Sequence, residues 1–286
     1  MKKLLLLLLC LLVPCAASAA YTLPIDLSVG MPLNDDCYTD ENTYIDPTIE
    51  MHITTGFDHE TVWWMADVVI GDASQLRTMP ASSFTSSATI RGRNLSRRAN
   101  AVLAVNGDFF SIEINKKGSY VLRQGTLYSE HLIGRTDILL IDEAGDFHVI
   151  RKANEGDVPE TIDGRAIVNG LCFGPVLVEN GAVCEVEEDS FIATDKERAR
   201  VALCQVGPLH YAVVVSSGPA KGSKGMTLAE FADTLGTLGL QTAYNLDGGN
   251  SAMMFTGDRM INVNRSTRDI SDIVYFASAW TDGEAD

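Results

Sequence analysis

The segment Val201-Ala-Leu-Cys-Gln-Val-Gly-Pro-Leu-His-Tyr-Ala-Val-Val-Val215 carries the strongest fold signal in the chain. Two apolar runs rich in β-branched residues flank a Gly-Pro pair, and this arrangement is typical of two strands joined by a tight turn. The sequence therefore predicts an antiparallel hairpin here. Two other segment pairs show the same pattern, Asp137–Ile141 with Phe147–Ile150 and Val176–Val178 with Ala182–Val183.

Further strands are predicted on both sides of these hairpins. Their residues alternate between apolar and polar types, or are mostly β-branched and aromatic, as strands require. They are Thr48–Ile53, Thr61–Ile70, Ala101–Val105, the hairpin Met253–Val263 and the final strand Asp272–Ser278.

Helices are fewer. Thr227–Leu238 has apolar residues at helical spacing, and Thr227 with Glu230 forms a capping box at its start. Ser82–Arg98 lacks strand alternation and is compatible with a polar helix. Because hairpins outnumber helices, we expect an α+β fold in which a mostly antiparallel or mixed β-sheet has few helices packed on it.

Residues 1–20 have the pattern of a secretory signal peptide. Two lysines precede the apolar run Leu4–Val13, and Ala17-Ser-Ala-Ala20 supplies small residues for cleavage. The apolar run is shorter than the roughly 20 residues that cross a bilayer. We therefore expect cleavage near Ala20 or Tyr21, a secreted protein, and no stable membrane insertion after cleavage. A retained lipid or membrane tether is the alternative, since Cys10 and Cys15 lie here.

The rest of the chain divides into a short extension and one domain. Residues 21–47 are rich in Asp, Asn, Pro and Thr and predict a loosely structured N-terminal extension, whereas residues 48–286 form the expected catalytic domain. Hydrophobic residues make up 46% of the sequence, enough for a large core. The net charge of −16 argues against nucleic acid as a partner.

The cysteines and histidines are not spaced like the ligands of a metal-binding motif. The four cysteines outside the signal segment have no Cys-x-x-Cys spacing, and they form either disulfides or free thiols. The five histidines show no ligand spacing. We expect neither a metal nor another cofactor.

Two segments place polar residues directly after an apolar strand, Ala104-Val-Asn106-Gly-Asp108-Phe-Phe110 and Tyr244-Asn245-Leu-Asp247-Gly-Gly-Asn-Ser251. Each puts a carboxylate and an amide beside glycine, which lets a ligand approach the backbone. Asn-Gly and Asp-Gly are also common turn dipeptides, so each segment alone has an ordinary structural explanation. Their occurrence together favours a shared site in one cleft. A serine hydrolase is poorly supported, since Gly249-Asn-Ser251-Ala252-Met253 lacks the second glycine of a nucleophile elbow.

The order of several motifs resembles the phosphodiester glycosidase family over roughly residues 50–280. The motifs are Asn106-Gly-Asp-Phe-Phe110, Phe173-Gly-Pro-Val-Leu177, Arg200-Val-Ala-Leu203, Gly225-Met-Thr-Leu-Ala-Glu-Phe-Ala232, Asn245-Leu-Asp-Gly-Gly-Asn-Ser251 and Arg268-Asp-Ile-Ser-Asp272. Two motifs depart from the family pattern. The usual Gly-Gly-Gly-Ser-Ser-Thr is here Gly248-Gly-Asn-Ser-Ala-Met253, and the usual Arg-Thr-Ala is Arg200-Val-Ala202.

The resemblance implies hydrolysis of the glycosidic C–O bond of a sugar-1-phosphodiester, in cell-envelope or exopolysaccharide glycans. An oxocarbenium-like transition state needs a nearby carboxylate, and we expect Asp247 first and Asp108 second to be catalytic. Arginine suits phosphate. The expected substrate-binding residues are Asn106, Arg200, Asn245, Gly248, Gly249, Asn250, Ser251 and Arg268, although Arg268 has salt bridges to Asp269 or Asp272 as an alternative.

Two other functions use the same residues. A non-catalytic carbohydrate-binding module of the cell envelope would bind a glycan through them without cleaving it. A general phosphodiesterase would break a P–O bond, but such enzymes usually have clustered metal ligands. The sequence favours the glycosidase.

Overall fold

The computed structural model describes residues 21–108, 119–132, 137–189 and 192–281. The predicted signal peptide and the last two residues of Asn106–Phe110 lie outside these ranges. Every strand pairing between named strands of the described residues is antiparallel, and the described helices are short. The predicted dominance of antiparallel sheet is confirmed, while "α+β" describes the chain only approximately.

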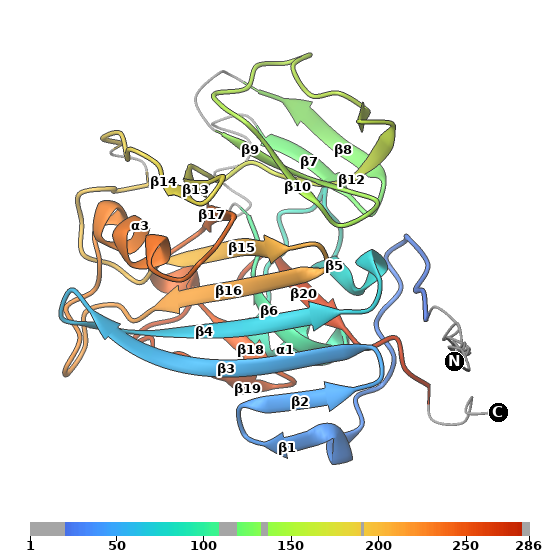
Figure 1. The fold of residues 1–286 in the computed structure, drawn as a ribbon, viewed down its shortest axis with the longest axis horizontal. Helices are drawn as coiled ribbons and strands as arrows, with labels where there is room; N and C mark the ends of the chain where they lie inside the picture. Colours follow the sequence, from blue (N-terminus) through green and yellow to red (C-terminus); the bar gives the residue numbers. More distant parts are fainter. Residues whose placement is uncertain (1–20, 109–118, 133–136, 190–191, 282–286) are drawn as a thin grey trace, which may run out of the picture.

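A nine-stranded sheet forms the largest layer (Figure 1). Its strands, in spatial order, are β1 (Tyr38–Asp40), β2 (Thr43–Asp46), β3 (Ile49–Asp58), β4 (Thr61–Ile70), β16 (His210–Ser216), β15 (Val201–Gly207), β17 (Thr242–Leu246), β13 (Val176–Glu179) and β14 (Ala182–Val183). The hairpin predicted from residues 201–215 lies in this sheet as β15 and β16, with Val201 opposite Val215.

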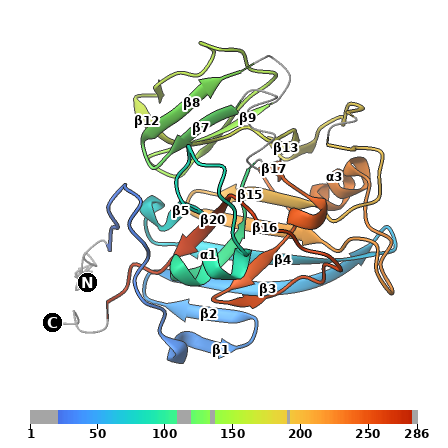
Figure 2. The same ribbon diagram turned by 180° about the vertical axis from the view of Figure 1, so that it is seen from behind.

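A five-stranded sheet packs against one face of the nine-stranded sheet. Its order is β19 (Arg259–Met260), β18 (Met254–Thr256), β6 (Ala101–Asn106), β20 (Asp272–Ala277) and β5 (Leu76–Pro80). Successive residues of β15 face opposite sides of the nine-stranded sheet. Leu203 faces the core between the two sheets, whereas Cys204 faces the hydrophobic cluster on the other side. Helix α1 (Gly92–Arg98) covers the far side of the five-stranded sheet (Figure 2).

The second helix, α3 (Leu228–Gly236), covers the outer face of the nine-stranded sheet. Leu228, Phe231 and Leu235 are fully buried there, and the predicted capping box is present between Thr227 and Glu230. No helix of the described residues is long and apolar enough to cross a membrane.

A six-stranded sheet lies at one end of the molecule, above the large sheet in Figure 1. It contains β10 (Phe147–Ile150), β9 (Ile138–Asp142), β12 (Arg165–Leu171), β7 (Ser119–Arg123), β8 (Thr126–His131) and β11 (Thr161–Ile162), which pairs with β12. The hairpin predicted for residues 137–150 is confirmed as β9 and β10. Short 3-10 helices complete the described secondary structure at Asp35–Cys37, Ala73–Gln75 and Gly249–Ser251.

Two local expectations were wrong. The segment 21–47 is not uniformly loose, since β1 and β2 extend the nine-stranded sheet and the side chain of Tyr44 is fully buried. These strands are so short, and their turn residues so polar, that no alternation is visible in sequence. The helix expected over Ser82–Arg98 is limited to α1, because Ile90 pairs with Ile270 as an isolated bridge.

All four cysteines of the described chain are free thiols. Cys172 and Cys204 are buried, as expected for cysteines in apolar strand-like runs, whereas Cys37 and Cys184 are half-buried.

Candidate active site

The turn that follows β17 can be built only with glycine. A Cβ atom at position 248 would lie 2.6 Å from the carbonyl oxygen of Ala199, which no real side chain tolerates. Gly249 has φ of +57°, and its N–H donates to the same carbonyl at 2.8 Å. The backbone of this turn is therefore fixed against the start of β15, and Asp247 stands at the end of a buried strand.

The second predicted segment meets the first. β6 ends at Asn106, whose side-chain amide donates to the carbonyl oxygen of Asp247 at 2.7 Å and accepts from the N–H of Met253 at 3.2 Å. Asn106 thus holds the backbone that carries Asp247, which is one of the two roles its sequence position suggested. Gly107 is needed for close approach, since a Cβ there would lie 2.5 Å from the carboxylate of Asp272.

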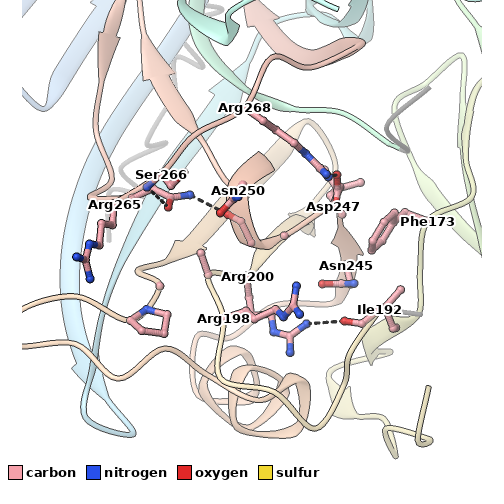
Figure 3. Close-up of a pocket in the computed structure, with 17 residues that line it drawn as sticks. Phe173, Ile192, Arg198, Arg200, Asn245, Asp247, Asn250, Arg265, Ser266 and Arg268 are labelled. Carbon is pink, nitrogen blue, oxygen red and sulfur yellow. Dashed lines mark hydrogen bonds and ion pairs between the residues drawn. The ribbon is translucent and has the colours of Figure 1, made fainter. Parts of the chain in front are cut away.

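Asp247 is held by a hydroxyl and a guanidinium. Its Oδ2 accepts a hydrogen bond from Ser251 Oγ at 2.6 Å and pairs with Arg268 Nη2, and Arg268 Nε also donates to Ser251 Oγ at 2.6 Å. Burial raises the pKa of Asp247. The contacts with Arg268 and Ser251 partly offset this rise, and the negative charge of Asp108 adds to it. Arg268 therefore contacts the predicted catalytic carboxylate directly (Figure 3).

Two further carboxylates lie beneath Asp247 and share one arginine. Arg123, which is 1% exposed, lies 3.4 Å from Asp108 and 3.7 Å from Asp272. Asp108 Oδ2 also accepts from the N–H of Cys172 at 2.7 Å, while its buried Oδ1 has no partner among the described residues. Two buried carboxylates with one guanidinium leave one negative charge uncompensated inside the protein.

Burial is the main cause of the shifted acidity in this cluster. It raises the pKa of Asp108 and, together with the charge of Asp108, raises the pKa of Asp272 to about 6, although Arg123 opposes both shifts. Groups that share a site in this way have their pKa values moved apart, which is how enzymes create an acid and a base from similar side chains.

Two cavities meet at Asp247. A small one of about 10 Å³ is lined by Asp108, Asp247 and Asp272 together with Asn106, Gly107, Ser251, Ile270 and Ser271. That volume corresponds to about one water molecule. The predicted convergence of Asp108 and Asp247 therefore holds in the structure, although Arg200 does not line this small cavity.

The other cavity is a pocket of about 790 Å³ that shares only Asp247 with the small one (Figure 3). Its walls contain four arginines and a single carboxylate, that of Asp247, in a chain whose net charge is −16. The lining residues are Phe173, Ile192, Arg198, Ala199, Arg200, Gly218, Pro219, Asn245, Leu246, Asp247, Gly248, Gly249, Asn250, Asn264, Arg265, Ser266 and Arg268.

Arg200 lines this pocket, but its guanidinium is hydrogen-bonded to backbone carbonyl oxygens. Its guanidinium donates four hydrogen bonds of 2.7 to 3.2 Å, to the carbonyl oxygens of Ile192, Ala193, Lys196 and Met226. Four of the five N–H donors of an arginine are thus used, and the residue is 3% exposed. Burial, aided by nearby Arg198, lowers the pKa of Arg200 to about 10, so it stays charged at neutral pH. This geometry favours a role in holding the pocket wall over the expected role in binding phosphate.

Asn245 presents an unsatisfied acceptor. Its Nδ2 donates to the carbonyl of Gly174 at 2.7 Å, while its buried Oδ1 has no partner among the described residues. The residue is 1% exposed and lines the large pocket. A buried amide oxygen without a protein partner is unusual in a folded protein and marks Asn245 as a candidate site residue.

The other predicted binding residues lie around the same turn. Gly248, Gly249 and Asn250 line the large pocket, but the N–H of Gly249 is already bonded to Ala199. Ser251 is buried against Asp247 and Arg268. Sequence reasoning missed Arg123, Arg198, Arg265 and Asp272. Asp272 ends the quoted motif Arg268-Asp-Ile-Ser-Asp272, and the alternation Arg198-Ala-Arg200 before a strand offered a signal for Arg198. Among the described residues, no group of three or more His, Cys, Asp or Glu side chains is arranged to hold a metal ion.

We expect the raised pKa of the buried Asp272 to be visible in how the free energy of unfolding depends on pH. The folded-state pKa of Asp272 is about 6, above the usual 3.8, so the folded chain keeps a proton that the unfolded chain releases in this window. Its contribution to stability is therefore present below about pH 4 and lost as pH rises through 6, by roughly 3 kcal/mol. Urea unfolding between pH 4 and 7 should show a smaller decline in Asp272→Asn than in the wild type.

The exposed neighbour Asp269 provides the control for this experiment, since Asp269→Asn should follow the wild-type pH profile. Parallel curves for the wild type and Asp272→Asn would show that Asp272 ionises in the folded protein as it does in the unfolded chain.

Residues 99–277 match the phosphodiester glycosidase family. The match covers more than half of the chain, so this protein belongs to that family. Among solved structures, the fold is similar to the catalytic domain of zebrafish N-acetylglucosamine-1-phosphodiester alpha-N-acetylglucosaminidase, auto-inhibited by its pro-peptide, with a TM-score of 0.64 and 16% identity over 82% of this chain and 84% of that chain.

A protein from Synechocystis is similar as well, with a TM-score of 0.54 and 15% identity over 83% of this chain and 64% of that chain. At these identities the two likenesses concern the fold alone. No curated protein sequence matches the chain.

Proposed function

We propose that this chain is a secreted hydrolase that cleaves the glycosidic C–O bond of a sugar-1-phosphodiester in cell-envelope or exopolysaccharide glycans. The observation that carries the proposal is the position of Asp247 in a member of the phosphodiester glycosidase family. This carboxylate separates a water-sized, carboxylate-lined cavity from a large arginine-lined pocket. Secretion rests on the signal-peptide pattern of residues 1–20.

The large pocket suits the two halves of such a substrate. Asn245, whose buried Oδ1 has no partner among the described residues, would accept from a sugar hydroxyl, and Phe173 would offer an apolar surface at the same end of the pocket (Figure 3). Arg268, half-exposed and paired with Asp247, would contact the scissile phosphate. A guanidinium there would stabilise the charge that develops on the departing phosphomonoester.

Asp247 would supply the negative charge at the anomeric carbon. Ser251 and Arg268 hold its Oδ2, and within the described residues Oδ1 makes no hydrogen bond. That oxygen can attack the anomeric carbon or activate water while stabilising an oxocarbenium-like transition state. A phosphomonoester is a good leaving group, so strong acid assistance is not required. If Asp247 attacks, the phosphomonoester leaves and water then cleaves the sugar–Asp247 ester; if Asp247 activates water, it takes the proton of that water. In either route the proton would pass to Asp108 or Asp272, which line the small cavity with Asp247.

The bond that is cleaved can be tested with labelled water. The purified protein would be incubated with a panel of sugar-1-phosphodiesters in ¹⁸O water, and the products analysed by mass. We expect the label in the released sugar, because attack occurs at carbon. Label only in the phosphate would mean P–O cleavage, as in an ordinary phosphodiesterase. Binding of a diester without any hydrolysis would indicate a carbohydrate-binding module.

A further inference from the structure

The large pocket carries more positive charge than is needed to neutralise a phosphodiester. Of its four arginines, Arg200 is bonded to backbone carbonyls and Arg268 is paired with Asp247. Arg198 and Arg265 are exposed, and neither pairs with an acidic side chain among the described residues. A phosphodiester carries one negative charge. The two unpaired guanidinium groups together carry two positive charges, so at least one remains after the phosphodiester is neutralised. That charge is available to another group of the substrate.

Both arginines lie near the same residue of the Asp247 turn, Gly249. The guanidinium of Arg198 stands over Gly249, where a Cβ atom would lie 3.8 Å from Arg198 Nη1. Arg265 follows Asn264, whose side-chain amide donates to the carbonyls of Gly249 at 2.8 Å and Ala252 at 3.1 Å. Arg198 thus lies beside the turn through its own side chain, and Arg265 through its neighbour Asn264.

The backbone of Arg198 is also fixed. Its N–H and C=O form a two-way bridge with Met226, at 3.1 and 3.0 Å. In Figure 3, Arg265 lies across the pocket from Phe173 and Asp247, with Arg198 between these two ends. A substrate whose sugar contacts Asn245 and Phe173 would therefore extend its leaving group toward Arg198 and Arg265.

We infer that Arg198 and Arg265 form a subsite for a second phosphate, carried by the leaving-group part of the substrate. A phosphomonoester has a charge of about −1.5 to −2 near pH 7, which matches two guanidinium groups. The pocket, at about 790 Å³, has room for such an extended ligand. The inference rests on the proposed function, because it assigns the substrate class of the same site.

The test uses two leaving-group products that differ by one phosphate, glycerol 1-phosphate and glycerol 1,3-bisphosphate. Their binding depends neither on the sugar nor on turnover. By isothermal titration, the bisphosphate should bind the wild type at least about tenfold more tightly, and the ratio should shrink with added NaCl because exposed charges are screened. In Arg198→Gln/Arg265→Gln the ratio should fall to near one. Arg93→Gln, an exposed change on α1 outside the pocket, should keep the wild-type ratio.

Failure of the subsite and failure of the proposed function give different results. An unchanged ratio in the double variant, or a bisphosphate that binds the wild type no more tightly than the monophosphate, overturns the subsite. Once a cleaved sugar is known, its diesters with glycerol and with glycerol 3-phosphate complete the test. Hydrolysis of both at equal kcat/KM would leave the glycosidase standing and remove the subsite. A preference for the bisphosphate that depends on the two arginines, without hydrolysis of any diester, would support the subsite and contradict the proposed glycosidase.

Discussion

Replacing Asp247 by Asn is expected to lower turnover by at least about a hundredfold, the scale of losing a positioned catalytic group. The amide keeps the shape of the side chain but removes the charge that the oxocarbenium-like transition state requires. Stability should be unchanged or slightly higher, because burial raises the pKa of Asp247 and so disfavours its charged form. Release of sugar gives the rate, and thermal unfolding shows whether the fold is intact.

Asp269→Asn is the matched control for this experiment. It makes the same chemical change at an exposed carboxylate next to Arg268, outside both cavities, and should retain wild-type turnover. Ser251→Ala should have an intermediate effect, since it removes one of the two groups that orient Asp247. Wild-type turnover in Asp247→Asn would remove this residue from the mechanism and leave Asp108 as the catalytic candidate.

Replacing Arg123 by Met is expected to lower the free energy of unfolding by about 3 to 5 kcal/mol at pH 7, because it leaves two buried carboxylates without their cation. The loss should shrink toward pH 5, because burial raises the pKa of Asp272 to about 6 and that group is then mostly neutral. Urea unfolding at the two pH values measures both effects. Adding Asp272→Asn to Arg123→Met should recover part of the loss at pH 7.

Arg93→Met controls for the change of residue type. Arg93 is exposed on α1, so its replacement should change stability by no more than about 0.5 kcal/mol. If Arg123→Met does not fold, Arg123→Gln removes the same charge while keeping a polar side chain and permits the same pH comparison. A loss below about 1 kcal/mol at both pH values would mean that the buried carboxylates are neutral in the folded protein at pH 7.

Local patterns in the sequence determined most of the fold. The residue 201–215 hairpin, the residue 137–150 hairpin and the capping box of Thr227 and Glu230 all appear where they were predicted. Each depends on residues close together in the chain, so propensity, turn chemistry and capping suffice to identify it. Strands β1 and β2 escaped prediction because they are too short, and their turn residues too polar, to show alternation, although Tyr44 is buried in the core.

Part of the site was also visible in sequence. The glycines around Asp108 and Asp247 mark strand ends where backbone and side chains approach closely, and the structure shows why glycine is required at positions 107 and 248. The sequence could therefore indicate that these two segments are special and predict that they meet. It could not say which polar side chains face substrate and which face the protein.

Tertiary structure alone decided those roles. Arg200 looked like a phosphate ligand but is surrounded by backbone carbonyls from residues 192–196 and Met226, whereas Arg198 and Arg265 line the open pocket. Arg123 and Asp272 lie 149 positions apart in the chain, in strands of two different sheets, and only the tertiary fold brings them to 3.7 Å. Hydrogen bonding and burial depend on atoms from distant strands, and a linear sequence does not contain those distances.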